Sequence, residues 1–250
     1  MGHGLHPLNV TNRCRSHLCV PGTSIDMIRR AADSAAEAVC LDLAPATSGA
    51  DKTRARRTVF AALDGIDWGC RGKRVSVRIG GPGSGDLADD LRAVLAGGGE
   101  TLDAVVVPGV ESAAEAADIA AMLVEAERAA ALPNIVSLEL QLSAPIAIGA
   151  AASIARMGGR LRALHLDRWY DDYAALSYLV LACRAFGLRA LEGPYAAVTD
   201  IAGLTHAAAR AASLGADGAW AVHPSQLDAI ADAFAADTAG RGRARALHAA

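Results

Sequence analysis

The feature that most constrains this chain is a series of eight short apolar runs spaced along its whole length. They begin at residues 17, 38, 75, 104, 135, 161, 189 and 220, so successive starts lie 21 to 37 residues apart. A polar break and an alanine-rich segment follow each run, and alanine has the highest helix propensity. The pattern predicts strands at 17–20, 38–41, 75–79, 104–107, 135–140, 161–166, 189–191 and 220–222.

Residues typical of helix ends flank several of the alanine-rich segments. Ser24 is the N-cap candidate that opens a predicted helical segment over 24–36. Ser112 is followed three residues later by Glu115, a capping-box pattern. Gly215 comes just after a predicted helix over 205–213, where a left-handed residue ends many helices. Strands that alternate with helices favour parallel pairing with right-handed crossovers.

Eight such units in 250 residues predict a single-domain (β/α)8 TIM barrel. The rival is an open, doubly wound sheet, which usually needs fewer strands and a topological switch point. We expect an N-terminal tail at 1–13, the barrel at 14–235 and a short C-terminal helix or tail at 236–250.

Charge and composition narrow the class of protein. With 24 Lys and Arg against 27 Asp and Glu, the net charge of −3 provides no basic field for nucleic acid. No window reaches about 18 uninterrupted apolar residues, so we predict no membrane span. The five cysteines form no CxxC pair, and no secretory signal is visible, which indicates reduced thiols and a cytoplasmic protein.

Polar residues stand where several of the predicted strands end. Active sites of TIM barrels lie at the carboxyl ends of the strands, so we predict a polar pocket there. His223 allows two interpretations, a general base or a residue that anchors the turn at Pro224. The other ionisable residues at strand ends are Asp42, Arg78, Asp167 and Glu192.

The same strand ends carry a family resemblance, which covers about residues 13–235. The matching segments are RSHLCVPG at 15–22, AVCLDL at 38–43, VRI at 77–79, VPGVES at 107–112, LELQ at 138–141, EGPY at 192–195 and GADGAWAVHPSQ at 215–226. The last of these segments is the most specific. With these segments the chain resembles the citrate lyase β-subunit/malyl-CoA lyase members of the HpcH/HpaI aldolase superfamily.

The resemblance implies reversible carbon–carbon cleavage of hydroxyacyl-CoA esters, by a retro-aldol or retro-Claisen route through an enolate. The family holds Mg²⁺ on carboxylates that follow the fifth and sixth strands. An arginine at the end of the third strand holds substrate oxygens. A carboxylate after the seventh strand, contributed across a subunit contact, acts in proton transfer. The resemblance therefore implies a homo-oligomer whose partner molecule is a small acid or an acyl-CoA.

Transferred to this sequence, the resemblance assigns catalytic roles to Arg78 and Glu192. One of Asp167, Asp171 and Asp172 would bind Mg²⁺, and the sequence leaves open which one. Ser143 stands where the family has its other metal-binding glutamate, and a hydroxyl brings no charge to the metal. The residues expected to bind substrate are Arg15, Pro21, Gly22, Asp42, Glu111 and His223.

These substitutions leave two functional hypotheses. In the first, the chain is a divergent carbon–carbon lyase with altered metal ligation. In the second, it is a catalytically degenerate paralogue that acts as a ligand-binding or assembly subunit and has lost the metal. The chain stops soon after Phe234, so we also expect it to lack most of the family's C-terminal helical cap.

Overall fold

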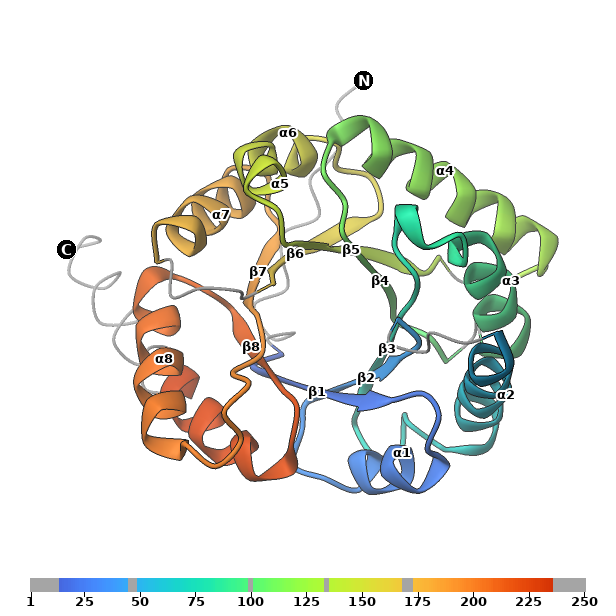
Figure 1. Cartoon of the computed structure of the whole chain (residues 1–250), viewed down its shortest axis with the longest axis horizontal. Coiled ribbons are helices and arrows are strands. Elements are labelled where there is room, and N and C mark those ends of the chain that lie inside the picture. The colour runs from blue at the N-terminus through green and yellow to red at the C-terminus, as the bar shows by residue number, and fades with distance from the viewer. Residues whose placement is uncertain (1–13, 45–48, 99–100, 133–134, 168–172, 236–250) are drawn as a thin grey trace.

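Eight parallel strands close into a barrel in chain order, with β1 paired to β8 (Figure 1). The computed structural model describes residues 14–44, 49–98, 101–132, 135–167 and 173–235, so the predicted segments 1–13 and 236–250 lie outside it. The TIM-barrel prediction is confirmed, and the open-sheet alternative is excluded. The strands are β1 (Ser16–Pro21), β2 (Ala38–Asp42), β3 (Arg74–Arg78), β4 (Ala104–Pro108), β5 (Ser137–Leu142), β6 (Leu161–Leu166), β7 (Arg189–Glu192) and β8 (Gly218–Ala221).

Helices surround the ring of strands on its outside (Figure 1). Short 3₁₀ turns, η1 (Pro82–Ser84) and η2 (Pro224–Gln226), follow β3 and β8. None of the helices within the described ranges is both long and apolar enough to cross a membrane. The helices are α1 (Ile25–Ala32), α2 (Gly49–Gly65), α3 (Leu87–Gly98), α4 (Ala113–Ala129), α5 (Pro145–Gly149), α6 (Ala151–Ala155), α7 (Tyr173–Ala185) and α8 (Ile201–Leu214).

β1 and β3 begin one residue earlier than the sequence predicts, and two other strands begin two residues away from their predicted starts. β5 begins at Ser137 rather than at 135, because the Val136 N–H donates to the Glu127 side chain at 2.7 Å. β8 begins at Gly218 rather than at 220. A Cβ atom at Gly218 would lie 2.5 Å from the Arg15 carbonyl oxygen, so only glycine lets β8 pass this close to the chain before β1.

The predicted helix caps form. The Ser24 hydroxyl accepts a hydrogen bond from Met27 N, and Ser112 accepts one from Glu115 N. Gly215 ends α8 with a left-handed φ of 107°. α8 starts at Ile201, earlier than the predicted 205, because the Asp200 carboxylate already caps the chain there.

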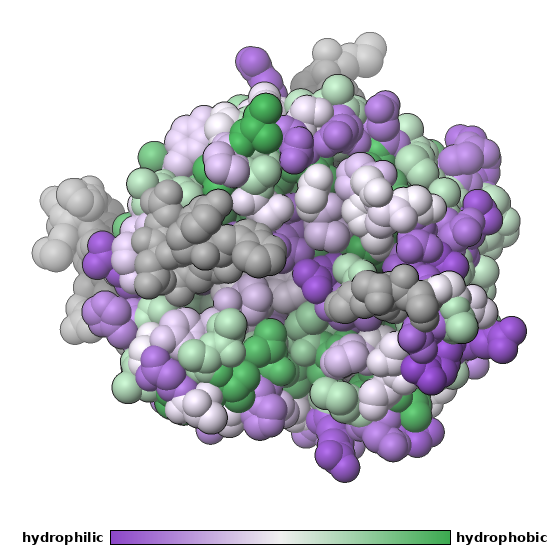
Figure 2. Space-filling view, viewed as in Figure 1, coloured by the Kyte–Doolittle hydropathy of each residue, from purple (hydrophilic) through white to green (hydrophobic). Residues whose placement is uncertain are grey.

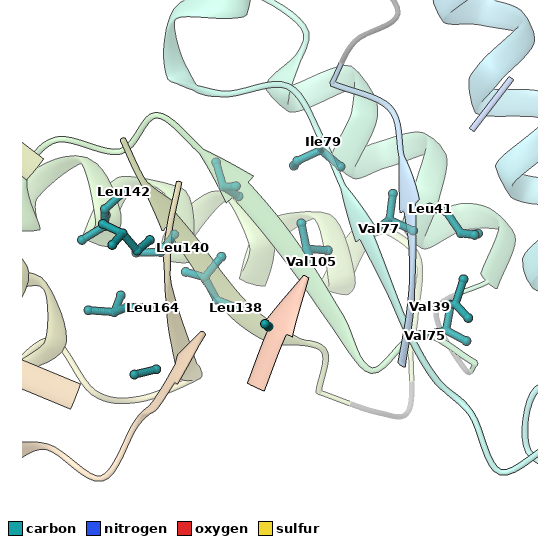
Figure 3. Close-up of a cluster of buried hydrophobic side chains, with 14 of the residues drawn as sticks. Val39, Leu41, Val75, Val77, Ile79, Val105, Leu138, Leu140, Leu142 and Leu164 are labelled. Atoms are coloured by element: carbon teal, nitrogen blue, oxygen red, sulfur yellow. The ribbon is translucent and has the colours of Figure 1, made fainter. Parts of the chain in front are cut away.

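Side-chain alternation divides every strand into a helix-facing and an interior face. On β5, Leu138, Leu140 and Leu142 belong to the apolar layer between barrel and helices, while Glu139 and Gln141 point into the barrel. Figure 3 shows this apolar layer from β2 to β6. On the surface, hydrophilic residues surround one face of the molecule and hydrophobic ones form small separate groups (Figure 2). Polar side chains that can interact with one another therefore lie on the interior face of the strands.

A chain of hydrogen bonds runs through that interior. The Trp220 indole N–H donates to His165 Nδ1 at 2.7 Å, and His165 Nε2 lies 2.9 Å from a Glu139 oxygen. Because an indole can only donate, His165 carries its proton on Nε2 and donates it to Glu139. Arg189 donates to the other Glu139 oxygen. Burial raises the pKa of Glu139, but the charge of Arg189 and the His165 hydrogen bond outweigh burial and hold it well below its usual range.

His17 is a second buried histidine of the interior, 4% exposed, with its ring edge-on to His165. Burial, and then the charge of Arg189, lower the pKa of His17 to about 3. The unfolded chain binds a proton at this residue below pH ~6.5, whereas the folded chain stays neutral until about pH 3. The free energy of unfolding should therefore fall by up to ~1.4 kcal/mol per pH unit as the pH drops through this window.

The interval from about pH 6.5 to 4.5 isolates His17, because Glu139 adds its own loss only below its unfolded pKa of ~4.3. Urea unfolding at a series of pH values measures the slope. We expect the loss of unfolding free energy between pH 6.5 and 4.5 to be about 2 kcal/mol smaller in His17→Gln than in wild type. His206→Gln, at an exposed position of α8, should keep the wild-type slope. An unchanged slope in His17→Gln would contradict this assignment.

Candidate active site

A partly buried ion pair lies at the carboxyl ends of two neighbouring strands. Arg78 and Asp42 are the last residues of β3 and β2 and are register partners. The Arg78 guanidinium donates from Nε to one Asp42 oxygen at 2.9 Å and from Nη2 to the other at 2.6 Å. The Ala44 N–H donates to the same carboxylate at 3.0 Å. This two-point contact fixes the plane of the guanidinium at the barrel mouth.

Arg78 also reaches across the barrel. Its Nη1 donates to the Gln141 amide oxygen at 3.1 Å, and its guanidinium carbon lies 5.8 Å from the centre of the Trp220 ring. Within the part of the chain that the structure describes, three of its five N–H groups are used. The remaining two can donate to the oxygens of a carboxylate or enolate.

Arg78 keeps its positive charge in the folded protein. Burial lowers its pKa, but the hydrogen bond from Arg78 to Asp42 and the charge of Asp42 outweigh burial and raise the pKa above the ordinary value. Arg78 is therefore cationic at every pH at which the protein is folded, and it does not serve as a proton donor.

A second ionic cluster supports the loops that follow β2 and β3. The fully buried Asp90 carboxylate accepts hydrogen bonds from Lys52 Nζ at 2.8 Å, Arg56 Nε at 2.7 Å and Gly80 N at 2.8 Å. Lys52 Nζ also donates to the Leu43 carbonyl at 2.8 Å. Leu43 follows Asp42 and Gly80 lies two residues after Arg78, so the cluster holds both ends of the ion pair in place.

The predicted metal residues fall on the neighbouring strands β5 and β6. Leu142 and Leu166 are register partners, and Asp167 N donates to the Leu142 carbonyl at 2.9 Å. Ser143 and Asp167 are thus the next residues on adjacent strands, at the same level of the mouth. The described residues contain no group of three or more His, Cys, Asp or Glu side chains that could hold a metal. The other two candidates, Asp171 and Asp172, lie outside the described residues.

Glu192, the predicted proton-transfer residue, is the last residue of β7 and is 4% exposed. Leu191 before it packs in the interior cluster with Trp220, whereas Ala190 belongs to the helix-facing layer. Alternation therefore directs Glu192 towards the helices, like its register partner Ala219. The structure does not bring it onto the interior face that carries Arg78.

His223 anchors the turn after β8. Its Nδ1 accepts a hydrogen bond from Ser225 N at 3.2 Å, and the side chain caps η2. The Gln226 amide oxygen accepts from the N–H groups of Val222 and His223, and its Nε2 donates to the Tyr195 carbonyl. This network supports the turn interpretation of His223, whose substrate contact stays a prediction, and it ties the loop after β8 to the loop after β7.

Arg15 requires a correction. It precedes β1, at the amino-terminal end of the barrel, where its side chain is paired with Glu37. Because β1 is six residues long, about 20 Å of strand separates Arg15 from the mouth, too far for a mouth-bound substrate. Pro21, Gly22 and Glu111 do follow or end strands at the mouth, and their substrate contacts stay predictions.

Two residues of the site were missed by the sequence analysis, Gln141 and Trp220. Gln141 stands two residues after Glu139 on an alternating strand, so it shares the interior face. Trp220 lies inside the specific 215–226 segment. Both signals were present, but no local pattern says that either side chain meets Arg78.

Comparisons with known proteins agree with this geometry. Residues 15–140 match the model of the HpcH/HpaI aldolase/citrate lyase family. The L-malyl-CoA/beta-methylmalyl-CoA lyase of Rhodobacter capsulatus is 30% identical, over 96% of this chain and 84% of the relative. The (3S)-malyl-CoA thioesterase of Cereibacter sphaeroides is 29% identical, over 91% of this chain and 77% of the relative.

A solved structure shares the fold over nearly the whole chain. The citrate lyase beta subunit from M. tuberculosis, complexed with oxaloacetate and magnesium, superposes with a TM-score of 0.73. It is 27% identical, and the alignment covers 91% of this chain and 99% of the other.

The Asp90 cluster leads to a stability prediction. Asp90→Ala would leave the buried Lys52 ammonium with only the more distant Asp86 carboxylate, at 3.8 Å, and breaking a buried pair costs about 3–5 kcal/mol. The matched control is Asp89→Ala on the same helix, whose exposed pair with Arg92 is worth under ~1 kcal/mol. Chemical denaturation measures both variants. Equal losses in the two variants would contradict a supporting role for the cluster.

Proposed function

The chain belongs to the HpcH/HpaI aldolase/citrate lyase family, and from this membership we propose that it is a carbon–carbon lyase acting on a hydroxyacyl-CoA ester. The observation that supports this most directly is Arg78 at the barrel mouth. It is held on two sides by Asp42 and Gln141, with two N–H groups left for substrate. The candidate substrate class is a malyl-CoA-type thioester, after the relatives that the chain resembles.

The reaction breaks the bond between the hydroxyl-bearing carbon and the carbon next to the thioester carbonyl. The hydroxyl loses its proton and becomes the carbonyl of an oxo-acid such as glyoxylate. The electron pair of the broken bond moves into the thioester unit as an enolate, which is then protonated to an acyl-CoA. Stabilising the developing oxyanion is the main electrostatic task of such a site.

Arg78 suits this task because its charge is permanent and its geometry is preset. Its two remaining N–H groups can hold the carboxylate of the oxo-acid or the enolate oxygen. Asp42 and Gln141 keep the guanidinium plane fixed, so little rotamer entropy is lost when substrate binds.

The donor set beside Arg78 fits Mg²⁺ with a single protein carboxylate. Mg²⁺ is commonly held by one or two carboxylates, with waters and substrate oxygens in its other positions. Asp167 would hold it, with the Ser143 hydroxyl as a neutral neighbour. When bound, the ion supplies Lewis-acid polarisation of a substrate oxygen. Gln141 lies two residues before Ser143 on the same strand face, a distance of about 7 Å along β5. Because Arg78 donates to Gln141, its guanidinium lies near the proposed metal position.

Proton transfer by Glu192 stays a prediction, as does a homo-oligomer in which a partner contributes a residue to the site. The Glu192 side chain starts from the helix-facing side of β7, so a role in this chain's own site requires it to turn around the strand end. Light scattering of the purified protein tests the oligomer.

A ligand-binding paralogue without turnover is the second candidate, and Ser143 is the observation that favours it. Incubation with L-malyl-CoA separates the possibilities. A lyase releases an oxo-acid and acyl-CoA, a thioesterase releases free CoA thiol and malate, and a binding protein gives saturable binding with neither product. Citramalyl-CoA and 3-hydroxyacyl-CoA extend the test to related acyl groups. Absence of a carbonyl product from all three substrates, an oxo-acid from the first two or an aldehyde or ketone from 3-hydroxyacyl-CoA, would overturn the lyase proposal.

Arg78→Lys tests the role of the guanidinium. Lysine keeps one charge but cannot make the two-point contact with Asp42 while presenting further donors. We expect kcat/KM for cleavage to fall by about 10²–10³, the usual loss for one oxyanion-stabilising donor. Arg92→Lys, an exposed residue of α3, is the control and should match wild type. A loss under threefold in Arg78→Lys would contradict the assignment.

Ser143→Glu tests the metal position. One added carboxylate ~4 Å from a doubly charged ion contributes about 2 kcal/mol even in a water-like dielectric, so Mg²⁺ affinity should rise at least ~10-fold. Ser143→Ala should change the affinity little, because it removes no charge. Isothermal titration with Mg²⁺ measures all three proteins. Unchanged affinity in Ser143→Glu would place the ion elsewhere.

A further inference from the structure

A small pocket lined by charged, polar and apolar side chains lies at the opposite end of the barrel from the candidate active site. Its walls come from residues at the start of several strands, and its cavity volume is about 10 Å³. The residues assigned to the proposed reaction lie at the other end of the barrel, so the reaction does not use this pocket. Its polar lining consists of His17, Arg74, Ser76, Asp103, Glu139 and Arg189.

One buried donor in this pocket lacks a partner. The Arg189 guanidinium uses Nη2 to bind Glu139, but its Nη1 is buried and makes no hydrogen bond with any residue that the structure describes. A buried donor left unsatisfied costs about 1–3 kcal/mol, and more when it is charged. An acceptor in the pocket would remove this cost.

Arg74 adds a second cation with spare donors. Among the described residues, its side chain has one ionic neighbour, Asp103, at 4.0 Å from Nε, and no hydrogen bond within 3.5 Å. The other Asp103 oxygen accepts a hydrogen bond from Val75 N at 2.7 Å. The Arg74 fork therefore faces the pocket with its donors largely unused.

Most of the acceptors that line the pocket are already engaged. Glu139 accepts from Arg189 and His165 on its two oxygens, and one Asp103 oxygen accepts from Val75 N, which leaves the other Asp103 oxygen, 4.0 Å from Arg74 Nε. The Ser76 hydroxyl can add one more donor. The pocket thus presents many N–H and O–H groups and few free lone pairs. A water molecule would bring two more donors, whereas an anion brings acceptors alone.

We propose that this pocket is a binding site for a small inorganic anion, held between the guanidinium groups of Arg74 and Arg189 at the amino-terminal end of the barrel. The open space admits about one water-sized particle, which selects a halide such as chloride over a phosphate or a carboxylic acid. The bound anion satisfies Arg189 Nη1 and stabilises the side of the barrel where the strands begin. The anion affects the stability of the barrel, so its binding can be measured without an assay of lyase activity.

The test combines crystallography with thermal unfolding. Crystals soaked in bromide should show an anomalous peak within hydrogen-bond distance of Arg189 Nη1, and Arg74→Gln crystals should lack it. In solution, the Tm should rise by about 2–4 °C in sodium chloride relative to sodium gluconate at equal ionic strength. Arg92→Gln, on the outer surface of α3, should keep the full chloride effect.

Ser76→Ala provides a second variant if Arg74→Gln does not fold, and it should reduce the chloride effect while leaving the barrel intact. A water in place of the bromide peak would overturn the proposal. Equal Tm values in the two salts, with bromide found only at surface arginines, would show an adventitious ion only and would overturn it too. A chloride effect of the same size in Arg74→Gln and wild type would assign the effect to another part of the protein.

Discussion

The alternation of side chains along eight parallel strands is the constraint on which the rest of this molecule depends. One face of each strand packs against the helices and is mostly apolar, and leucine, valine and isoleucine occupy those positions from β2 to β6. The other face points into the barrel, where a charged residue is tolerated only with a partner. The interior therefore organises its polar groups into pairs and chains, with Arg78 and Asp42 at one end and Glu139 and Arg189 towards the other.

These two ends are physically connected. Arg78 lies over the Trp220 ring, whose N–H fixes the His165 tautomer, and His165 in turn holds Glu139. The platform beneath Arg78 is thus supported by a network that continues to the opposite side of the barrel. Because residue 143 is a serine, the proposed chemistry depends more on this preset guanidinium than on a tightly held metal.

Much of the architecture could be predicted from the sequence, because it follows from local patterns. The spacing of the apolar runs indicated eight strands, and Ser24, Ser112 and Gly215 marked helix ends that the structure confirms. The limits of that reasoning show at Val136, which looks like a strand residue but bonds to a side chain from α4. Arg15 shows another limit, since a motif match says nothing about which end of the barrel a residue occupies.

The sequence by itself determined the barrel, its family and the ring of polar residues at the strand ends, because periodicity and motif spacing are properties of neighbouring residues. Only the tertiary structure decided which of those residues meet. Arg78 is joined to Asp42 and Gln141 because register and closure bring β2, β3 and β5 around one interior, while Glu192 follows the alternation of β7 towards the helices. These contacts join side chains 36 and 63 positions apart in the sequence, and a local sequence pattern does not show which distant residues will meet.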